Sequence, residues 1–279
     1  MKNFTKILAF MLVAVMAVAC FAACGDDTAA NTTAADATGD AVDTTAANAD
    51  TQAKVYKIAS DNAFPPFESL DLASGEYVGI DMDIMAAIAE DQGFAYTMDN
   101  VGFDAALNQV QANQADGVIA GMTITDARKE TFDFSEGYFA DGQVMVVAAD
   151  SDIDSMEDLA GKVVATKAGT MGTEYAEANK ETYGYTTILY EGSVEMYQAV
   201  MQGTCVACFE DRAVIGDAIS SGNVTLKTVG EVINPSNYGF AVKKGENAEL
   251  LAMFNAGLAN IKENGKYAEI LAKYGITAE

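Results

Sequence analysis

Short apolar runs, separated by glycine-rich loops and amphipathic stretches, characterise the chain from residue 54 onward. In the run 55–60 (VYKIAS), polar Lys57 stands between apolar Tyr56 and Ile58, which is typical of a half-buried strand. Residues 84–92 and 248–264 instead repeat apolar positions every three or four residues, which predicts helices. Predicted strands and helices alternate along the chain, and this alternation favours an α/β fold.

The elements group into two α/β units that the chain connects twice. The first unit begins at residue 54, and its first helix is expected to be capped by Asp81 and to end at Gly93. The chain leaves this unit near 142–147 and returns near 232–238. Two crossings side by side predict a hinge between two lobes. The predicted lobes are 54–143 with 236–279, and 144–235.

The stretch Ile119–Tyr138 has the residues of an anion pocket. An apolar run stops at Gly121, where a backbone can approach a ligand closely, and Thr123 follows. Thr125 and Asp126 predict a helix start, which would place Arg128 in the first turn beside free N–H groups. The alternative is a strand end, a capped helix and a solvated arginine.

The arginine count favours a specific role for Arg128. The chain has 16 Lys and Arg residues, of which only Arg128 and Arg212 are Arg. Arginine is suited to planar, two-pronged binding of a carboxylate, so we expect Arg128 to bind one. For Arg212 we expect a local ion pair or a solvent-exposed position.

Composition excludes several classes of function. A formal net charge of −25 argues against nucleic-acid binding. The absence of His removes the usual general base and the commonest metal ligand. Cys205 and Cys208 lie three apart in a predicted strand, about 10 Å from each other and beyond disulfide reach. We expect both to be buried structural residues, and we predict neither a metal nor a cofactor.

The N-terminus predicts export. Lys2 and Lys6 precede an apolar run from Ile7 to Ala23, which is a secretory signal peptide over 1–23. Phe21-Ala22-Ala23-Cys24-Gly25 resembles a bacterial lipobox, which implies cleavage before Cys24 and lipid on its sulfur. Alternatives are a lipid on Cys20 or plain secretion. Residues 24–53 are rich in Ala, Thr and Asp without aromatics and predict a disordered tether at the outer face of the cell membrane.

A proline-fixed loop follows the first strand. Pro65 and Pro66 make it rigid and extended, and it presents Phe64 and Phe67 just past a strand end. Open α/β sheets bind ligands at such ends. One phenylalanine is expected to pin the loop to the core, and we expect Phe64 to face the ligand.

Five collinear motifs resemble the bacterial extracellular solute-binding proteins of family 3, the polar-amino-acid receptors of ABC importers. They are DNAFPPFE (61–68), GIDMDIMAAIA (79–89), GMTITDARKETFDFSEGY (121–138), DLAGKVVATKAGT (158–170) and FEDRAV (209–214). The resemblance implies a two-lobed periplasmic-binding-protein-like fold of type II with two hinge crossovers. It also implies a monomer that passes a polar amino acid to a permease.

The resemblance implies roles for individual residues. Arg128 would pair with the ligand's α-carboxylate, helped by Thr123 and Thr170. Asp211 and the carbonyl of Gly121 would take the α-ammonium. The resemblance also places Phe64 and Phe103 on either side of the ligand's side chain, and Asp61, Lys167 and Glu210 at its distal end.

The mixed charge at the distal end bears on the ligand. Lys167 argues against a cationic side chain, and Asp61 and Glu210 argue against an anionic one. We therefore favour a neutral polar ligand such as glutamine, with basic amino acids as the alternative. Two other functions use the same scaffold: an enzyme similar to cyclohexadienyl dehydratases, with Glu210 as acid or base, and a ligand sensor for a membrane receptor. We expect no enzymatic activity.

Overall fold

The computed structural model describes residues 54–278. The predicted signal peptide, Cys24 and the tether 24–53 lie outside the described residues, so those predictions stand on the sequence. Among residues 54–278 no helix has both the length and the apolar character needed to cross a membrane.

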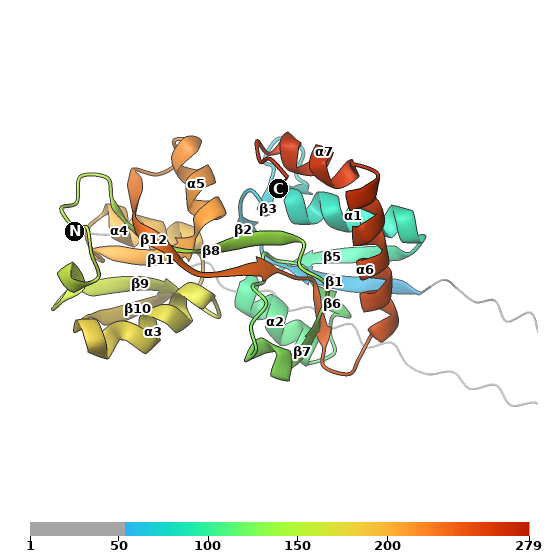
Figure 1. The fold of residues 1–279 in the computed structure, drawn as a ribbon, viewed down its shortest axis with the longest axis horizontal. Helices are drawn as coiled ribbons and strands as arrows, with labels where there is room; N and C mark the ends of the chain where they lie inside the picture. Colours follow the sequence, from blue (N-terminus) through green and yellow to red (C-terminus); the bar gives the residue numbers. More distant parts are fainter. Residues whose placement is uncertain (1–53, 279) are drawn as a thin grey trace, which may run out of the picture. The chain divides into compact units, whose positions relative to one another are not determined.

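Two five-stranded sheets organise the described chain, and each defines one lobe (Figure 1). The sheet of lobe 1 has the order β5-β1-β6-β13-β7, with β1, β5 and β6 parallel and β13 antiparallel. Its strands are β1 (Val55–Ser60), β5 (Ala95–Asn100), β6 (Gly117–Val118), β7 (Phe132–Phe134) and β13 (Ala241–Lys243). A three-stranded sheet beside it consists of β2 (Ala63–Phe64), β3 (Glu68–Leu70) and β4 (Tyr77–Val78).

Helices cover both faces of the lobe 1 sheet. Tyr56 and Ile58 of β1 point to one core, while Ala59 points to the other, because successive strand side chains alternate between faces. The first core is closed by α1 (Ile80–Gln92), α6 (Ala248–Glu263) and α7 (Lys266–Lys273), and the second by α2 (Phe103–Gln111). As predicted, α1 ends at Gly93, which is in the left-handed conformation (φ 70°).

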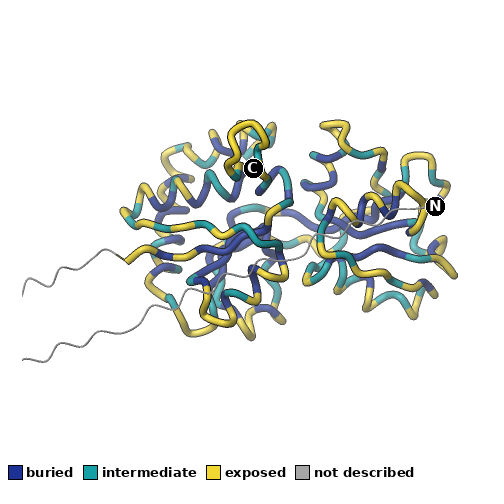
Figure 2. Tube along the Cα trace, turned by 180° about the vertical axis from the view of Figure 1, so that it is seen from behind, coloured by how far each residue is buried: buried dark blue, intermediate teal, exposed yellow. Residues whose placement is uncertain are grey.

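Lobe 2 has the strand order β10-β9-β11-β8-β12, with β8 antiparallel to both neighbours. Val144 and Val146 of β8 face one core and Met145 and Val147 the other, so this strand is buried on both sides. In both lobes buried residues gather along the inner strands, and exposed residues gather on the surrounding helices and loops (Figure 2). The elements are β8 (Phe139–Ala148), β9 (Val163–Lys167), β10 (Thr186–Tyr190), β11 (Ala207–Asp211), β12 (Leu226–Tyr238), α3 (Met171–Tyr183), α4 (Ser193–Met201) and α5 (Arg212–Ser220). Two short 3₁₀ turns complete the set, η1 (Arg128–Glu130) and η2 (Glu157–Leu159).

Two long strands link the lobes. β8 follows β7 out of lobe 1, and β12 leads back to β13. They pair antiparallel from Leu226 opposite Ala148 to Tyr238 opposite Phe139 (Figure 1). The return crossing expected near 232–238 is therefore the second half of β12. Register shifts around Ile233 keep β12 continuous through Asn234 and Pro235, although these two residues interrupt the hydrophobic pattern. The proline is tolerated because β12 is an edge strand of its sheet.

Two cap predictions were wrong. No α-helix begins at Thr125, where the chain forms only the three-residue η1, although Thr125 Oγ1 does accept a hydrogen bond from the N–H of Arg128 (3.1 Å). Asp81 does not cap α1, whose N-cap is Gly79. The Asp81 side chain points to lobe 1 groups distant in sequence, because burial against them replaces the local cap.

Predictions for two other groups are confirmed. Cys205 and Cys208 are both buried and free of disulfides, although Cys205 precedes β11 rather than lying in it. Burial raises the pKa of both thiols. Arg212 is exposed and forms a local ion pair with Asp141 (Nε to Oδ1, 3.4 Å).

Candidate ligand site between the two lobes

Side chains from the carboxyl ends of strands in both sheets meet between the lobes. Asp61 follows β1, Lys167 ends β9 and Asp211 ends β11. This is the edge of an open α/β sheet where ligands bind. Eleven residues line the pocket formed there: Asp61, Phe64, Phe103, Ala120, Gly121, Thr123, Arg128, Lys167, Thr170, Met171 and Asp211.

Nine of the ten residues predicted to bind the ligand are in this set. The exception, Glu210, lies just behind it: its carboxylate accepts hydrogen bonds from the Tyr197 hydroxyl (2.7 Å) and the Asp211 N–H (3.0 Å). Ala120 and Met171 line the pocket without having been predicted. Each directly precedes or follows a predicted residue, and that adjacency is the signal that would have found them.

An aromatic wall forms one side of the pocket. Phe64 and Phe103 are both almost fully buried, and both line it. Phe67 packs instead into the core of lobe 1, edge-on to the rings of Phe139 and Tyr238 at 4.9 and 5.1 Å. The two phenylalanines of the proline loop therefore divide as expected, one toward the pocket and one into the core.

Gly121 packs directly against that wall. Its φ of 54° is left-handed, and a Cβ atom at this position would lie 2.6 Å from Cε1 of Phe64. Its N–H donates to Oδ2 of Asp81 (2.8 Å). Only glycine meets both the backbone and the space requirements here.

Arg128 is buried without a carboxylate partner. Its Nη1 donates to the carbonyl oxygen of Thr123 (2.8 Å) and its Nη2 to that of Gly169 in lobe 2 (2.9 Å). Only 7% of the residue is exposed, and no carboxylate of residues 54–278 forms an ion pair with it. Burial lowers its pKa, while the more distant charges of Glu174 and Asp211 raise it.

Lobe 2 supplies the helix start that the sequence had predicted in lobe 1. Helix α3 begins at Met171, and Thr170 caps it by accepting from the N–H of Thr173 (3.3 Å). The first-turn N–H groups of a helix lack partners within the helix, and its dipole favours a nearby anion. Thr170 and Met171 both line the pocket, so this helix start adjoins it.

Lys167 and Asp61 form an ion pair across the lobes. Nζ of Lys167 lies 2.5 Å from Oδ2 of Asp61, and both side chains are 3% exposed. The same Nζ lies 4.6 Å from the centre of the Phe64 ring and 6.0 Å from that of Phe103. Burial lowers the pKa of Lys167, but attraction to Asp61 and Glu210 outweighs it and the pKa is raised.

Asp211 has no ion pair of this kind among the described residues. Its Oδ1 accepts from Nε2 of Gln143 at 2.5 Å. Burial, together with the negative charges of Glu210 and Asp141, raises the pKa of Asp211 to about 7. The carboxylate is therefore short of positive charge, and a bound cation would restore its ionised form.

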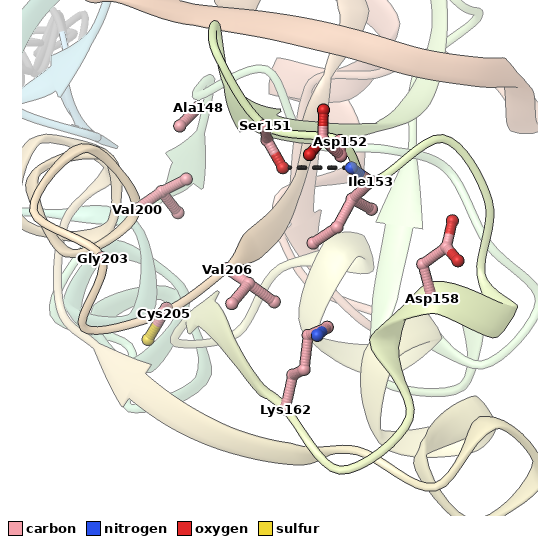
Figure 3. Close-up of a pocket in the computed structure, with 10 residues that line it drawn as sticks. All are labelled: Ala148, Ser151, Asp152, Ile153, Asp158, Lys162, Val200, Gly203, Cys205 and Val206. Atoms are coloured by element: carbon pink, nitrogen blue, oxygen red, sulfur yellow. Dashed lines mark hydrogen bonds between the residues drawn. The ribbon is translucent and has the colours of Figure 1, made fainter.

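The lobes are close together at this site. The remaining cavity is about 10 Å³, no more than the roughly 10–15 Å³ that is needed to hold one water molecule. A much larger pocket, about 440 Å³, opens elsewhere in lobe 2 (Figure 3). Its polar side chains bond locally: Ser151 Oγ accepts from the Ile153 N–H, and Asp158 Oδ2 from the Ser155 N–H. Convergent polar groups, which mark ligand sites, are found at the inter-lobe pocket.

Comparison with known proteins identifies the family. Residues 56–277 match the profile of the bacterial extracellular solute-binding proteins, family 3. The chain belongs to this family. It is 31% identical over 274 residues to the "ABC transporter glutamine-binding protein GlnH" of Bacillus subtilis, covering 96% of this chain and 97% of that one. It is 32% identical over 237 residues to the "Probable histidine-binding protein" of Neisseria gonorrhoeae, covering 82% and 86%.

Two solved structures bear on the arrangement of the family 3 lobes. An ancestral arginine-binding protein bound to glutamine is 35% identical, with a TM-score of 0.73 over 79% of this chain and 97% of that one. The second substrate-binding domain of Lactococcus lactis GlnP in an open conformation is 41% identical but has a TM-score of 0.56, over 80% and 96%. The less identical, ligand-bound structure fits better, which agrees with the inter-lobe contacts. The fold is the type II arrangement of such binding proteins, with its two crossovers.

Proposed function

We propose that this protein is a receptor that binds a polar amino acid between two closing lobes and delivers it to an ABC importer. The observation that carries the proposal is the buried guanidinium of Arg128, which within residues 54–278 donates its hydrogen bonds to carbonyl oxygens alone. A buried charge without an opposite charge is costly, so this site favours a ligand that brings an anion. The α-carboxylate of an amino acid meets that need, with Thr123 and the start of α3 beside it.

The ligand's ammonium group has its own partners in the pocket. Asp211 from lobe 2 and Gly121 from lobe 1 both line the pocket, and the Gly121 carbonyl is the group that we assign to the ammonium. Each hydrogen bond that involves a charged group contributes about 1.5–3 kcal/mol in a dry site. Because Arg128 requires an anion and Asp211 a cation, the pocket selects a zwitterion.

Glutamine is the side chain that we favour. Lys167 and Asp61 already neutralise each other, and together they offer a donor and an acceptor. A side-chain amide has the matching acceptor and donor. Basic amino acids are the second candidate, because Asp61 lines the pocket and Glu210 lies behind it, but Lys167 repels a second cation.

Binding requires the lobes to part and close. A cavity of about 10 Å³ admits no amino acid, so entry needs motion about β8 and β12. The moving bodies that we propose are 54–143 with 236–279, and 144–235. Closure excludes water from the charged contacts, and it gives the transporter a shape to sense.

The working location that we propose is the outer face of the cell membrane. There the monomer would be held by a lipid on Cys24 and a tether over 24–53, after loss of the signal peptide 1–23. A ligand sensor for a membrane receptor would use the same pocket, and a neighbouring permease gene would distinguish the two. An enzyme is disfavoured because Glu210, its candidate acid or base, does not line the pocket.

Calorimetric titration of the purified protein with all twenty amino acids tests the proposal. We expect measurable binding of L-glutamine and weaker binding of most others. Binding of none would refute the receptor function. Tight binding of L-arginine or L-lysine without L-glutamine would keep the receptor and reverse the preferred side chain.

A further inference from the structure

Two carboxyl groups are completely buried in lobe 1, behind the ligand pocket. Glu68 belongs to β3 and Asp81 to the first turn of α1, and neither side chain is exposed to solvent. The N–H of Asp81 donates to the carbonyl oxygen of Phe67, the residue before Glu68 (3.1 Å). This contact places Asp81 beside the chain segment that carries Glu68, and each carboxyl group shifts the pKa of the other, although neither lines the pocket.

The two carboxyl groups differ in their partners. Oδ2 of Asp81 accepts from the N–H of Gly121 (2.8 Å) and from the hydroxyl of Tyr138 (2.9 Å). Within residues 54–278, no backbone N–H, hydroxyl or amide donates to either Glu68 oxygen or to Oδ1 of Asp81. Three buried oxygens therefore lack a conventional donor, which is rare and needs an explanation.

One proton held between the carboxyl groups explains two of the three: the Glu68 oxygen that carries it, and Oδ1 of Asp81, which accepts from it. Two carboxylates in one dry site cannot both be ionised, because their charges repel and burial disfavours each. A proton on one of them makes it a donor to the other. Asp81 receives two hydrogen bonds that stabilise its ionised form, whereas Glu68 receives none, so the proton belongs on Glu68.

The surrounding charges point the same way. Burial and the negative charges of Asp81 and Asp61 raise the pKa of Glu68 well above its usual value, and Lys167 lowers it only partly. The other titratable groups that interact with the pair are the hydroxyls of Tyr138 and Tyr267. Burial raises the pKa of both tyrosines, so they stay neutral donors.

We propose that Glu68 and Asp81 share one proton, held on Glu68, and that this pair positions Gly121 to receive the ligand's ammonium group. The role of Gly121 rests on the proposed function. Asp81 holds the N–H of Gly121 while Phe64 blocks the space beside its Cα, and these two constraints set the direction of the Gly121 carbonyl. Glu68 acts through Asp81, so both are positioning residues. Loss of the proton places two charges behind the site and loosens it.

Vibrational spectroscopy tests the shared proton without any ligand. The difference spectrum between wild type and Glu68→Gln at neutral pH is expected to show the carbonyl stretch of a protonated carboxylic acid. Glu76→Gln, which changes an exposed glutamate after β3, is the matched control and should show only loss of a carboxylate. If Glu68→Gln also shows only loss of a carboxylate, the proposal is wrong.

Calorimetry with L-glutamine tests the positioning role. Glu68→Gln keeps a donor to Asp81 and should bind like wild type near neutral pH, but its affinity should fall less on the alkaline side. Glu68→Leu removes the donor and should bind at least about tenfold more weakly, because it leaves a buried acceptor unpaired. Wild-type affinity in Glu68→Leu, or identical pH profiles for wild type and Glu68→Gln, would contradict the proposal.

Unfolding in urea gives a third readout that does not depend on binding. A buried acid with a raised pKa binds more protons in the folded state, so its contribution to stability declines as pH rises through the folded pKa. Between the unfolded and the folded pKa of Glu68, the ratio of the wild-type unfolding constant to that of Glu68→Gln should therefore rise by up to about tenfold per pH unit. Equal pH dependence in the two proteins would overturn the shared proton. If no amino acid binds wild type while the spectrum and the unfolding agree with the pair, the proposed function fails and the pair stands.

Discussion

The two cations buried in the inter-lobe pocket, Arg128 and Lys167, have different partners. Arg128 is buried against carbonyl oxygens, whereas the Lys167 ammonium lies 2.5 Å from the Asp61 carboxylate. Both cations are almost inaccessible, so burial does not separate them. What differs is the partner. The unmet charge at Arg128 requires an anion from the ligand, and the satisfied pair at Lys167 requires a side chain with no net charge.

Removing Arg128 is expected to have the largest effect on this comparison. Arg128→Ala should weaken amino-acid binding by about 100-fold or more, since losing one partner of a buried charged pair costs about 2–5 kcal/mol. Calorimetry or fluorescence titration measures the loss. Arg212→Ala is the matched control, because the other arginine is exposed and pairs with Asp141, and it should bind nearly as well as wild type. Equal losses of affinity in the two variants would show that Arg128 does not bind the ligand's carboxylate.

Removing Lys167 should change the ligand preference more than the overall affinity. Lys167→Met leaves Asp61 buried and unpaired, a state that costs about 3–5 kcal/mol unless a ligand cation replaces the lost one. We expect the affinity for L-arginine relative to L-glutamine to rise by about 100-fold, as measured by paired titrations. Lys162→Met, which removes an exposed lysine just before β9, should leave the ratio unchanged. An unchanged ratio in Lys167→Met would show that the distal end does not select by charge.

The proposed pairing of Asp211 with the ligand's ammonium group predicts that affinity depends on pH. Asp211 must be ionised to pair with the ligand, and its pKa is raised to about 7 by burial and by Glu210 and Asp141. Affinity should therefore fall below pH 7, by up to about tenfold per pH unit, because the ligand must displace a proton. Asp211→Asn should bind more weakly, and its affinity should not fall in this way. A wild-type affinity that is constant from neutral to acidic pH would contradict the role of Asp211.

Gly121 should give the smallest effect of this series. Gly121→Ala forces a left-handed residue and a Cβ atom 2.6 Å from Phe64, which together cost about 1–3 kcal/mol. We expect affinity to fall by about tenfold and thermal stability to fall slightly. Gly184 has a similar φ of 70° but open space around it, so Gly184→Ala controls for backbone strain alone. If both variants bind alike, contact with Phe64 does not matter.

The sequence predicted much of the fold because the hydrophobic pattern is local. The periodicity of residues 84–92 and the glycine at 93 defined α1, and the alternation at 55–60 defined β1. Where tertiary contacts override local preference, prediction failed. Asp81 could cap α1, but Gly121 and Tyr138 offer its carboxylate buried donors. The bulges that carry β12 past Pro235 likewise depend on pairing with β8.

The candidate site divides in a similar way. The resemblance supplied most of the residues that line the pocket, from Asp61 to Asp211. The resemblance did not say which of these residues contact one another. Lys167 and Asp61 are 106 residues apart in the sequence, and Arg128 and Gly169 are 41 apart, so no local pattern joins them. The resemblance also placed Glu210 at the distal end, but successive strand residues point to opposite faces, and Asp211 rather than Glu210 lines the pocket.

Removing one charge of the ligand at a time tests the central claim most directly. L-Glutamine would be titrated into the wild-type protein beside two analogues, one lacking the α-ammonium and one lacking the α-carboxylate. Because each charged end has its own partners in the pocket, we expect each analogue to bind about 100-fold more weakly than L-glutamine or worse. An analogue that binds as tightly as L-glutamine would show that the pocket does not recognise a zwitterion.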